Sequence, residues 1–216
     1  ETLAEWGSEH GYAVEREGDV LRFDGAQSFD VEFVEGDLYK HEVKIDGRYD
    51  LVVAHALLDV LDLRRATERL LSLGDYFYFP VCFDGVTSFE PPFEETDGKT
   101  SFDAGVERVY HTTMDADDRA GSSKTGRRAF DAVRSAGGTV TSAGASDWVL
   151  FPGEDGYTDD EEVLLCHILG TVHGAVREEG SLDTEKLDAW LNDRIERIED
   201  EDLVYVAHQI DLAGRC

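Results

Sequence analysis

One stretch, residues 49–83, constrains the fold of this chain more than any other, because its hydrophobic pattern changes period twice. An unbroken apolar run at residues 51–54 is typical of a strand that is buried on both faces of a parallel sheet. Leucines then recur at helical spacing over residues 57–71, with charged side chains between them. A second apolar strand follows at residues 76–83. This order predicts one βαβ unit, with two parallel strands and a right-handed crossover.

The length of the chain, 216 residues, allows one sizeable hydrophobic core, so we expect a single α/β domain over residues 1–216. No apolar run is long enough to span a bilayer, and no secretory signal pattern is present. The cysteines are few and scattered: Cys82, Cys166 and Cys216. This usage favours a reducing compartment, so we expect a cytoplasmic protein without a membrane partner. The chain begins at Glu1 without a methionine, which suggests a fragment or a processed product.

The charge of the chain is strongly negative, with 48 Asp and Glu against 20 Lys and Arg and a net charge of −28. The acidic residues are spread along the whole chain, which is typical of a salt-adapted, halophilic surface. An ordinary acidic protein is the alternative. For the salt-adapted case we expect the melting temperature to rise with salt, because counterions screen the repulsion between carboxylates. Either interpretation disfavours nucleic acid as a partner, since phosphate binding needs clustered cations.

The stretch 49–83, with an aspartate before its first strand and the continuation HALLDVLD, resembles the fourth and fifth strands of class I S-adenosylmethionine-dependent methyltransferases. The resemblance implies a Rossmann-like α/β sheet, mostly parallel, with an antiparallel last strand. The further strands of this sheet are expected at residues 29–35, 139–151 and 202–210. The glycine-rich cofactor loop of the family is not found in this chain. The resemblance therefore covers the later part of the fold, truncated at the N-terminus.

The resemblance also implies residues that bind the cofactor, S-adenosylmethionine. Asp37 and Leu38, at the end of the strand expected over residues 28–38, take the positions that bind the adenine amine and pack on its ring. An aspartate in an ordinary turn is the alternative. His55 takes a position that contacts the substrate and the methionine end of the cofactor. Asp59 lies one helical turn after His55, and a histidine beside a carboxylate is the arrangement of a general base; a structural histidine at a helix start is the alternative.

Residues 84–121 show little regular pattern and contain the pair Pro91-Pro92. A loop of this length is uncommon inside a compact domain unless it has a function. It leaves the carboxyl end of a central strand, where ligands bind in open α/β sheets. We therefore expect a substrate lid.

A helix is expected over residues 122–136, with Ser122 or Ser123 as its N-cap. Four cations and no acid occur in the ten residues around this helix start: Arg119, Lys124, Arg127 and Arg128. Helix N-termini favour anions, so Arg119, Lys124 and Arg127 form a candidate site for a substrate carboxylate or phosphate. The alternative is that these side chains pair with the acidic residues around them.

A helical insertion is expected over residues 153–200, between the last two strands, with amphipathic helices at about 159–177 and 183–199. Its apolar stripes need a partner, so we expect a cap or a homodimer surface there. His167 and His173 are six residues apart and do not share a helix face, so no metal site is expected.

The favoured function is S-adenosylmethionine-dependent methyl transfer to a small molecule. The alternative is a non-catalytic α/β binding or assembly module that lacks the cofactor loop. Methyl transfer requires in-line positioning, a dry pocket and in some cases a base, so the sequence does not identify the methyl acceptor.

Overall fold

The computed structural model describes residues 2–40, 48–93, 101–116 and 120–216. Contacts divide the chain into two compact units, Glu1–Glu42 and Val43–Cys216. The sequence suggested one domain over residues 1–216, whereas each unit has its own sheet. The two units are therefore described separately.

The first unit consists of one short helix and a three-stranded antiparallel sheet, with the elements α1 (Leu3–Glu9), β1 (Ala13–Glu17), β2 (Val20–Asp24) and β3 (Phe29–Glu32). A capping box between Thr2 and Glu5 begins α1. A two-residue turn joins β1 to β2, where Gly18 has a positive φ of 64° that glycine adopts without strain. Phe23 is buried beneath the helix, in contact with Gly7.

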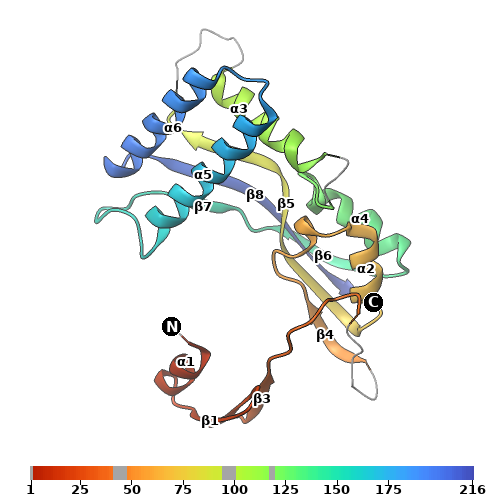
Figure 1. Cartoon of the computed structure of the whole chain (residues 1–216). Coiled ribbons are helices and arrows are strands. Elements are labelled where there is room, and N and C mark those ends of the chain that lie inside the picture. Colours follow the sequence, from red (N-terminus) through yellow and green to blue (C-terminus); the bar gives the residue numbers. More distant parts are fainter. Residues whose placement is uncertain (1, 41–47, 94–100, 117–119) are drawn as a thin grey trace. The chain divides into compact units, whose positions relative to one another are not determined.

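The second unit is built on a five-stranded sheet made of β4 (Tyr49–Val53), β5 (Gly74–Glu90), β6 (Thr139–Ala145), β7 (Trp148–Leu150) and β8 (Val204–Arg215). The strand order is β4-β5-β8-β6, and β7 also pairs with β8. β4 and β5 are parallel, while β8 runs antiparallel to β5, β6 and β7. Figure 1 shows the long strands β5 and β8 side by side through the whole unit.

The prediction of a mostly parallel Rossmann-like sheet is wrong. The five-stranded sheet is mixed, because the last strand inserts between β5 and β6 and opposes every strand that it contacts. The strand expected near residues 29–35 belongs to the separate antiparallel sheet of the first unit. The sequence pattern did not reveal the β1–β2 hairpin. Strands that are joined by a tight turn can pair only in the antiparallel direction. The parallel β4–β5 pair and the antiparallel direction of the last strand are confirmed.

The helices of the second unit are η1 (Leu58–Val60), α2 (Leu63–Leu71), α3 (Phe102–Met114), α4 (Thr125–Ser135), α5 (Glu161–Glu179) and α6 (Thr184–Glu199). α2 and α4 pack together against one end of the sheet, and α3, α5 and α6 surround the other end (Figure 1). In the part of the chain that the structure describes, no helix has the length and apolar character needed to cross a membrane.

The helical insertion is formed by α5 and α6, which lie between β7 and β8 in the chain. Their apolar stripes are buried inside the second unit, where Leu165, Leu169 and Trp190 pack with Phe89 of β5 and Val106 of α3. Because these apolar stripes are already buried within the second unit, they do not need a second copy of the chain to cover them.

The long loop expected over residues 84–121 is not what the structure shows. β5 continues to Glu90, and residues 102–114 form α3. The strand pattern was obscured because register shifts between Phe79 and Cys82 and between Phe83 and Thr87 interrupt the alternation of side chains. Ser101 caps α3 by accepting the N–H of Ala104.

The two faces of the sheet differ at its β4–β5 end. On one face, Phe77 and Phe79 are buried against the helices, with 1% and 0% of their surface exposed. On the other face, Leu51 and Val53 are 52% and 53% exposed, and their neighbour on β5, Tyr76, is 53% exposed. These are called the covered face and the open face below.

Candidate functional site

The connection that follows β4 is held in a strained conformation beside a break in β5. Ala54 and Ala56 donate backbone hydrogen bonds to Tyr78 and Pro80, at 3.1 and 3.2 Å. Ala56 and Val81 have positive φ angles of 47° and 58°, which are unusual for residues other than glycine. Such strain persists only where the surroundings enforce it, and it gathers at functional sites. This place is therefore the first candidate for a site in the second unit.

Asp59 lies on the covered side of this break. Its Oδ1 accepts the N–H of Phe83 at 3.0 Å, and its carboxylate also accepts a hydrogen bond from the side chain of Thr125. Burial raises the pKa of Asp59 to about 6, although these two hydrogen bonds lower it in part. A carboxyl group with this pKa exchanges its proton close to neutral pH, as a general base must.

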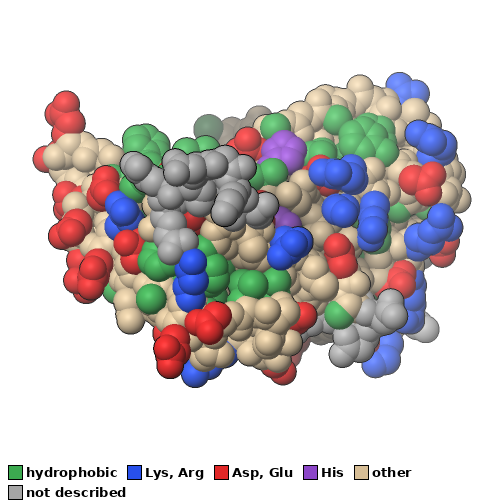
Figure 2. All heavy atoms as spheres, turned by 90° about the horizontal axis from the view of Figure 1, so that it is seen from above, with side chains coloured by type: hydrophobic (Ala, Val, Ile, Leu, Met, Phe, Trp, Pro, Cys, Tyr) green, Lys and Arg blue, Asp and Glu red, His purple; other side chains and the backbone are tan. Residues whose placement is uncertain are grey.

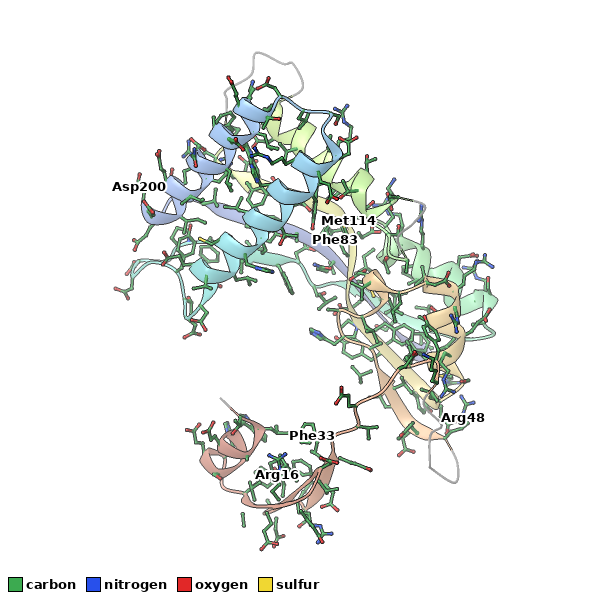
Figure 3. All side chains as sticks on the ribbon, viewed as in Figure 1. Arg16, Phe33, Arg48, Phe83, Met114 and Asp200 are labelled. Atoms are coloured by element: carbon green, nitrogen blue, oxygen red, sulfur yellow. The ribbon has the colours of Figure 1, made fainter. Side chains whose placement is uncertain are left out.

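A cavity of about 530 Å³ opens beside Asp59. Its other lining residues come from α3, α5 and the segments next to them: Val60, Tyr110, Thr113, Met114, Ala120, Gly121, Thr171 and Ala175. Residue 121 must be glycine here, because a Cβ would collide with the carbonyl oxygen of Asp59. Met114 packs against the core cluster that contains Phe83, and Figure 3 shows these two labelled residues close together in the second unit. The size and the mixed polar and apolar lining suit a small organic molecule.

His55 is exposed at the carboxyl end of β4. Among the described residues, no hydrogen bond or ion pair joins it to Asp59, the partner that the sequence suggested. The carboxylate that senses the charge of His55 is Asp211, on β8. The described hydrogen bonds and ion pairs therefore do not join His55 to either carboxylate, and the two predicted catalytic residues do not form a contact pair.

Asp211 accepts three hydrogen bonds on the open side of the break in β5. The N–H of Val81 and the hydroxyl of Ser146 donate to Oδ1 at 2.8 and 2.6 Å, and the hydroxyl of Tyr78 donates to Oδ2 at 3.1 Å. Burial would raise the pKa of Asp211, but these bonds and the charge of His55 outweigh it and lower the pKa.

Cys82 lies between the two carboxylates. Burial, followed by the charges of Asp59 and Asp211, raises the pKa of its thiol to about 12. The thiol is therefore protonated at neutral pH, which excludes it as a nucleophile under these conditions.

Of the three predicted anion-binding cations, Arg119 lies outside the described residues, and Arg127 pairs with a carboxylate of the protein. The Nε of Arg127 donates to both oxygens of the buried Asp84 at 2.9 and 3.0 Å, and its backbone N–H donates to Oδ1 at 2.9 Å. Ser122 and Ser123 donate to Asp115. The expected serine N-cap is wrong, because Lys124 is the N-cap residue and makes no side-chain cap bond. Arg127 therefore matches the alternative in which these cations pair with the acidic residues around them.

Lys124 lines a second cavity, of about 300 Å³, together with His111, Glu107 and Asp115. The Nε2 of His111 is 3.1 Å from the hydroxyl of Thr87, and burial lowers the pKa of this imidazole. In Figure 2, Lys and Arg side chains gather at the end of the unit formed by α2 and α4, while Asp and Glu side chains predominate at the α5–α6 end. The cavity carries charges of both signs, so its lining does not select for an anion.

The predicted cofactor residues belong to different units: Asp37 and Leu38 to the first unit, and His55 to the second. Asp37 accepts the N–H of Tyr39 at 2.9 Å and pairs with Lys40 at 2.9 Å, so both of its oxygens are engaged in its own turn. This arrangement matches the turn alternative for Asp37.

The sequence interpretation missed Tyr78, Ser146 and Asp211, which three separate segments bring together. The only available signal was Asp211, the one acidic residue in the twelve-residue strand β8. A carboxylate inside a strand needs partners, but the sequence does not say which ones.

In the described part of the chain, no group of three or more His, Cys, Asp or Glu side chains could hold a metal ion. Comparison with known proteins yields no family model that matches the chain and no curated protein that is significantly similar to it.

Proposed function

We propose that this chain contains the acceptor-binding part of an enzyme that methylates a small molecule, with Asp59 as the general base. The observation that carries the proposal is the carboxyl group of Asp59, whose pKa is raised to about 6 and which lines a cavity of about 530 Å³ at the end of a parallel strand. This cavity lies beside the connection that follows the carboxyl end of β4.

In the proposed reaction, the acceptor lies in the cavity with its nucleophilic hydroxyl, amine or thiol directed at Asp59. The ionised carboxylate takes the proton from this group as the new bond forms. The Phe83 N–H fixes the carboxylate in position, and the half-buried Met114 lines the cavity beside it. Above pH 6 the carboxylate is mostly ionised, so the rate should rise with pH and level off above about pH 6.

The methyl donor in this proposal, S-adenosylmethionine, rests on the sequence resemblance alone. We therefore assign no residue of the second unit to the donor.

The test uses the whole chain in molar potassium chloride with methyl-labelled S-adenosylmethionine and a protein-free extract of small metabolites. We expect label to appear in the small-molecule fraction, with a large loss at pH 7 for Asp59→Asn. The control is Asp50→Asn, which removes an exposed carboxylate at the start of β4 and should retain the activity. Absence of transfer, together with absence of S-adenosylmethionine binding in calorimetry, would reject the proposal.

The second candidate, a non-catalytic binding module, is favoured by one observation: both carboxylate oxygens of Asp37, the residue predicted to bind the adenine, are engaged within its own turn. In that case metabolites from the same extract should still bind to the chain, as native mass spectrometry can detect. Asp59→Asn would then change which molecules bind, and no label would be transferred.

A further inference from the structure

We propose that the second cavity, which α3 and the start of α4 line, binds a small zwitterion: a molecule with one ammonium and one carboxylate group, such as a free amino acid. In this site Glu107 binds the ammonium group, and Lys124 and Arg108 bind the carboxylate group. The site is separate from the cavity beside Asp59, and the proposal goes beyond the methyl transfer proposed above.

The two cavities lie against different faces of α3. Glu107, His111 and Asp115 follow one another at intervals of four residues and line the second cavity. Tyr110 and Met114 line the cavity beside Asp59. Because residues four apart share one face of a helix, α3 presents a separate set of side chains to each cavity.

The two acidic side chains of the second cavity differ in how many of their oxygens are already bound. The Oδ1 of Asp115 accepts the Ser122 hydroxyl and the Ser123 N–H, both at 2.9 Å, and its Oδ2 accepts the Ser123 hydroxyl at 2.7 Å. The Oε1 of Glu107 accepts the N–H of Thr87 at 2.9 Å, while its Oε2 makes no hydrogen bond to any described residue. Glu107 is therefore the carboxylate that retains an oxygen for an ammonium group.

The two cations of this cavity, Lys124 and Arg108, are exposed, and neither side chain makes a hydrogen bond or ion pair within the described ranges. Their neighbour Arg127, by contrast, pairs with Asp84 at 2.9 Å. Cations without a partner in the protein are available to a carboxylate, which ammonium and guanidinium groups bind through charge-assisted hydrogen bonds. The groups that remain for a ligand are thus two cations and one carboxylate oxygen.

His111 forms a rigid, uncharged part of the lining. Its Nε2 is 3.1 Å from the hydroxyl of Thr87, and its ring meets the ring of Phe83 edge to face at 5.4 Å between centroids. Burial lowers the pKa of this imidazole, so it is neutral at pH 7 and the lining carries two cations and two carboxylates. A singly charged ligand is attracted by one end of such a site and repelled by the other, whereas a zwitterion is attracted at both ends.

The first test compares ligands that differ by one charged group. Glycine, L-alanine and L-serine are titrated into the whole chain in molar potassium chloride, and the amide NMR signal of Thr87, which is bonded to Glu107, reports binding. Propionate lacks the ammonium group of alanine, and ethylamine lacks its carboxylate. We expect saturable shifts with the amino acids at millimolar concentration, and binding of both analogues weaker by about tenfold or more. Binding of none of the amino acids, or of either analogue as tightly as alanine, would overturn the proposal.

The second test removes one charge of the site at a time. Glu107→Gln keeps an acceptor for the Thr87 N–H, and Lys124→Met keeps the length of the side chain. Each variant should weaken the binding of alanine by about tenfold in calorimetry. The matched controls are Glu178→Gln and Arg134→Met, which remove exposed charges from α5 and α4 and should leave the affinity unchanged.

Equal losses of affinity in the site variants and their controls would contradict the assignment of these residues. Circular dichroism of the same samples identifies a variant that has unfolded, and the ligand comparison on the unchanged chain decides the proposal in that case. Neither measurement uses a methyl donor, so failure of methyl transfer and failure of zwitterion binding are distinguished.

Discussion

Asp59 and Asp211 lie on opposite sides of the same break in β5, and each lowers the acidity of the Cys82 thiol between them. Their own pKa values nevertheless move in opposite directions. Asp59 is more deeply buried and accepts two hydrogen bonds, so desolvation dominates. Asp211 is more accessible and accepts three, from Val81, Ser146 and Tyr78, so stabilisation of the charge dominates. The pKa of each carboxyl group is therefore set by the balance between burial, which raises it, and hydrogen-bond donors, which lower it, rather than by its position along the strand.

The largest expected difference between the two sides concerns packing. Phe79→Ala removes a fully buried ring from the covered face and should lower the free energy of unfolding by about 3–5 kcal/mol. Tyr78→Ala removes a 38% exposed ring from the open face and should cost about 1 kcal/mol, mostly for the hydrogen bond to Asp211. Urea unfolding of both variants in molar salt measures the difference, and equal costs would show that the open face is covered in solution.

The second prediction concerns the pH dependence of Asp59→Asn. The folded pKa of about 6 lies above the reference value of 3.8, so the native state binds more protons between these values and loses stability as the pH rises through them. The asparagine avoids this cost and can still accept the Phe83 N–H. It should stabilise the protein by up to about 3 kcal/mol at pH 7 and by little at pH 4. A variant that is less stable than the wild type at pH 7 would contradict the raised pKa.

The third prediction concerns Ser146→Ala, which removes one donor from Asp211. The lowered pKa of this carboxyl contributes stability above its unfolded value, and this stability is lost as the pH falls through the folded value. The variant should raise the pKa of Asp211 and cost about 1 kcal/mol at pH 7, with a smaller cost at low pH. A carbon-detected NMR titration of the Asp211 carboxyl measures the pKa. A cost that is independent of pH would mean that the hydroxyl matters for packing alone.

The smallest expected effect concerns the strained backbone at Ala56, in the connection that follows β4. Ala56 has a φ of 47°, which glycine adopts without the steric cost that a Cβ brings. Ala56→Gly should therefore stabilise the protein by about 0.5 kcal/mol, after the entropy of the more flexible unfolded chain is counted. Ala54→Gly, two residues earlier at a buried position without positive φ, is the control and should destabilise the protein. The opposite order would show that the connection is not strained.

Local sequence patterns by themselves determined those parts of the fold that depend on neighbours in the chain. The period change over residues 49–83 identified the parallel β4–β5 unit, and the amphipathic patterns identified α5 and α6 nearly to the residue. These elements follow from hydrophobic spacing and capping, which act over a few residues. The same reasoning failed at the bulges of β5, because a register shift changes the face of each later side chain.

Only the tertiary structure decided which residues meet at the candidate site. The sequence supplied His55 and Asp59 as a pair because they lie one helical turn apart, but residues 54–57 are not helical, so that spacing does not bring their side chains together. Asp211 reaches Tyr78 and Val81 because β8 returns antiparallel along β5, a pairing that depends on long-range packing. The raised pKa of Asp59 likewise comes from burial under α3 and α4, elements more than 40 residues away in the chain. Proximity and desolvation are properties of the folded core, and no local pattern encodes them.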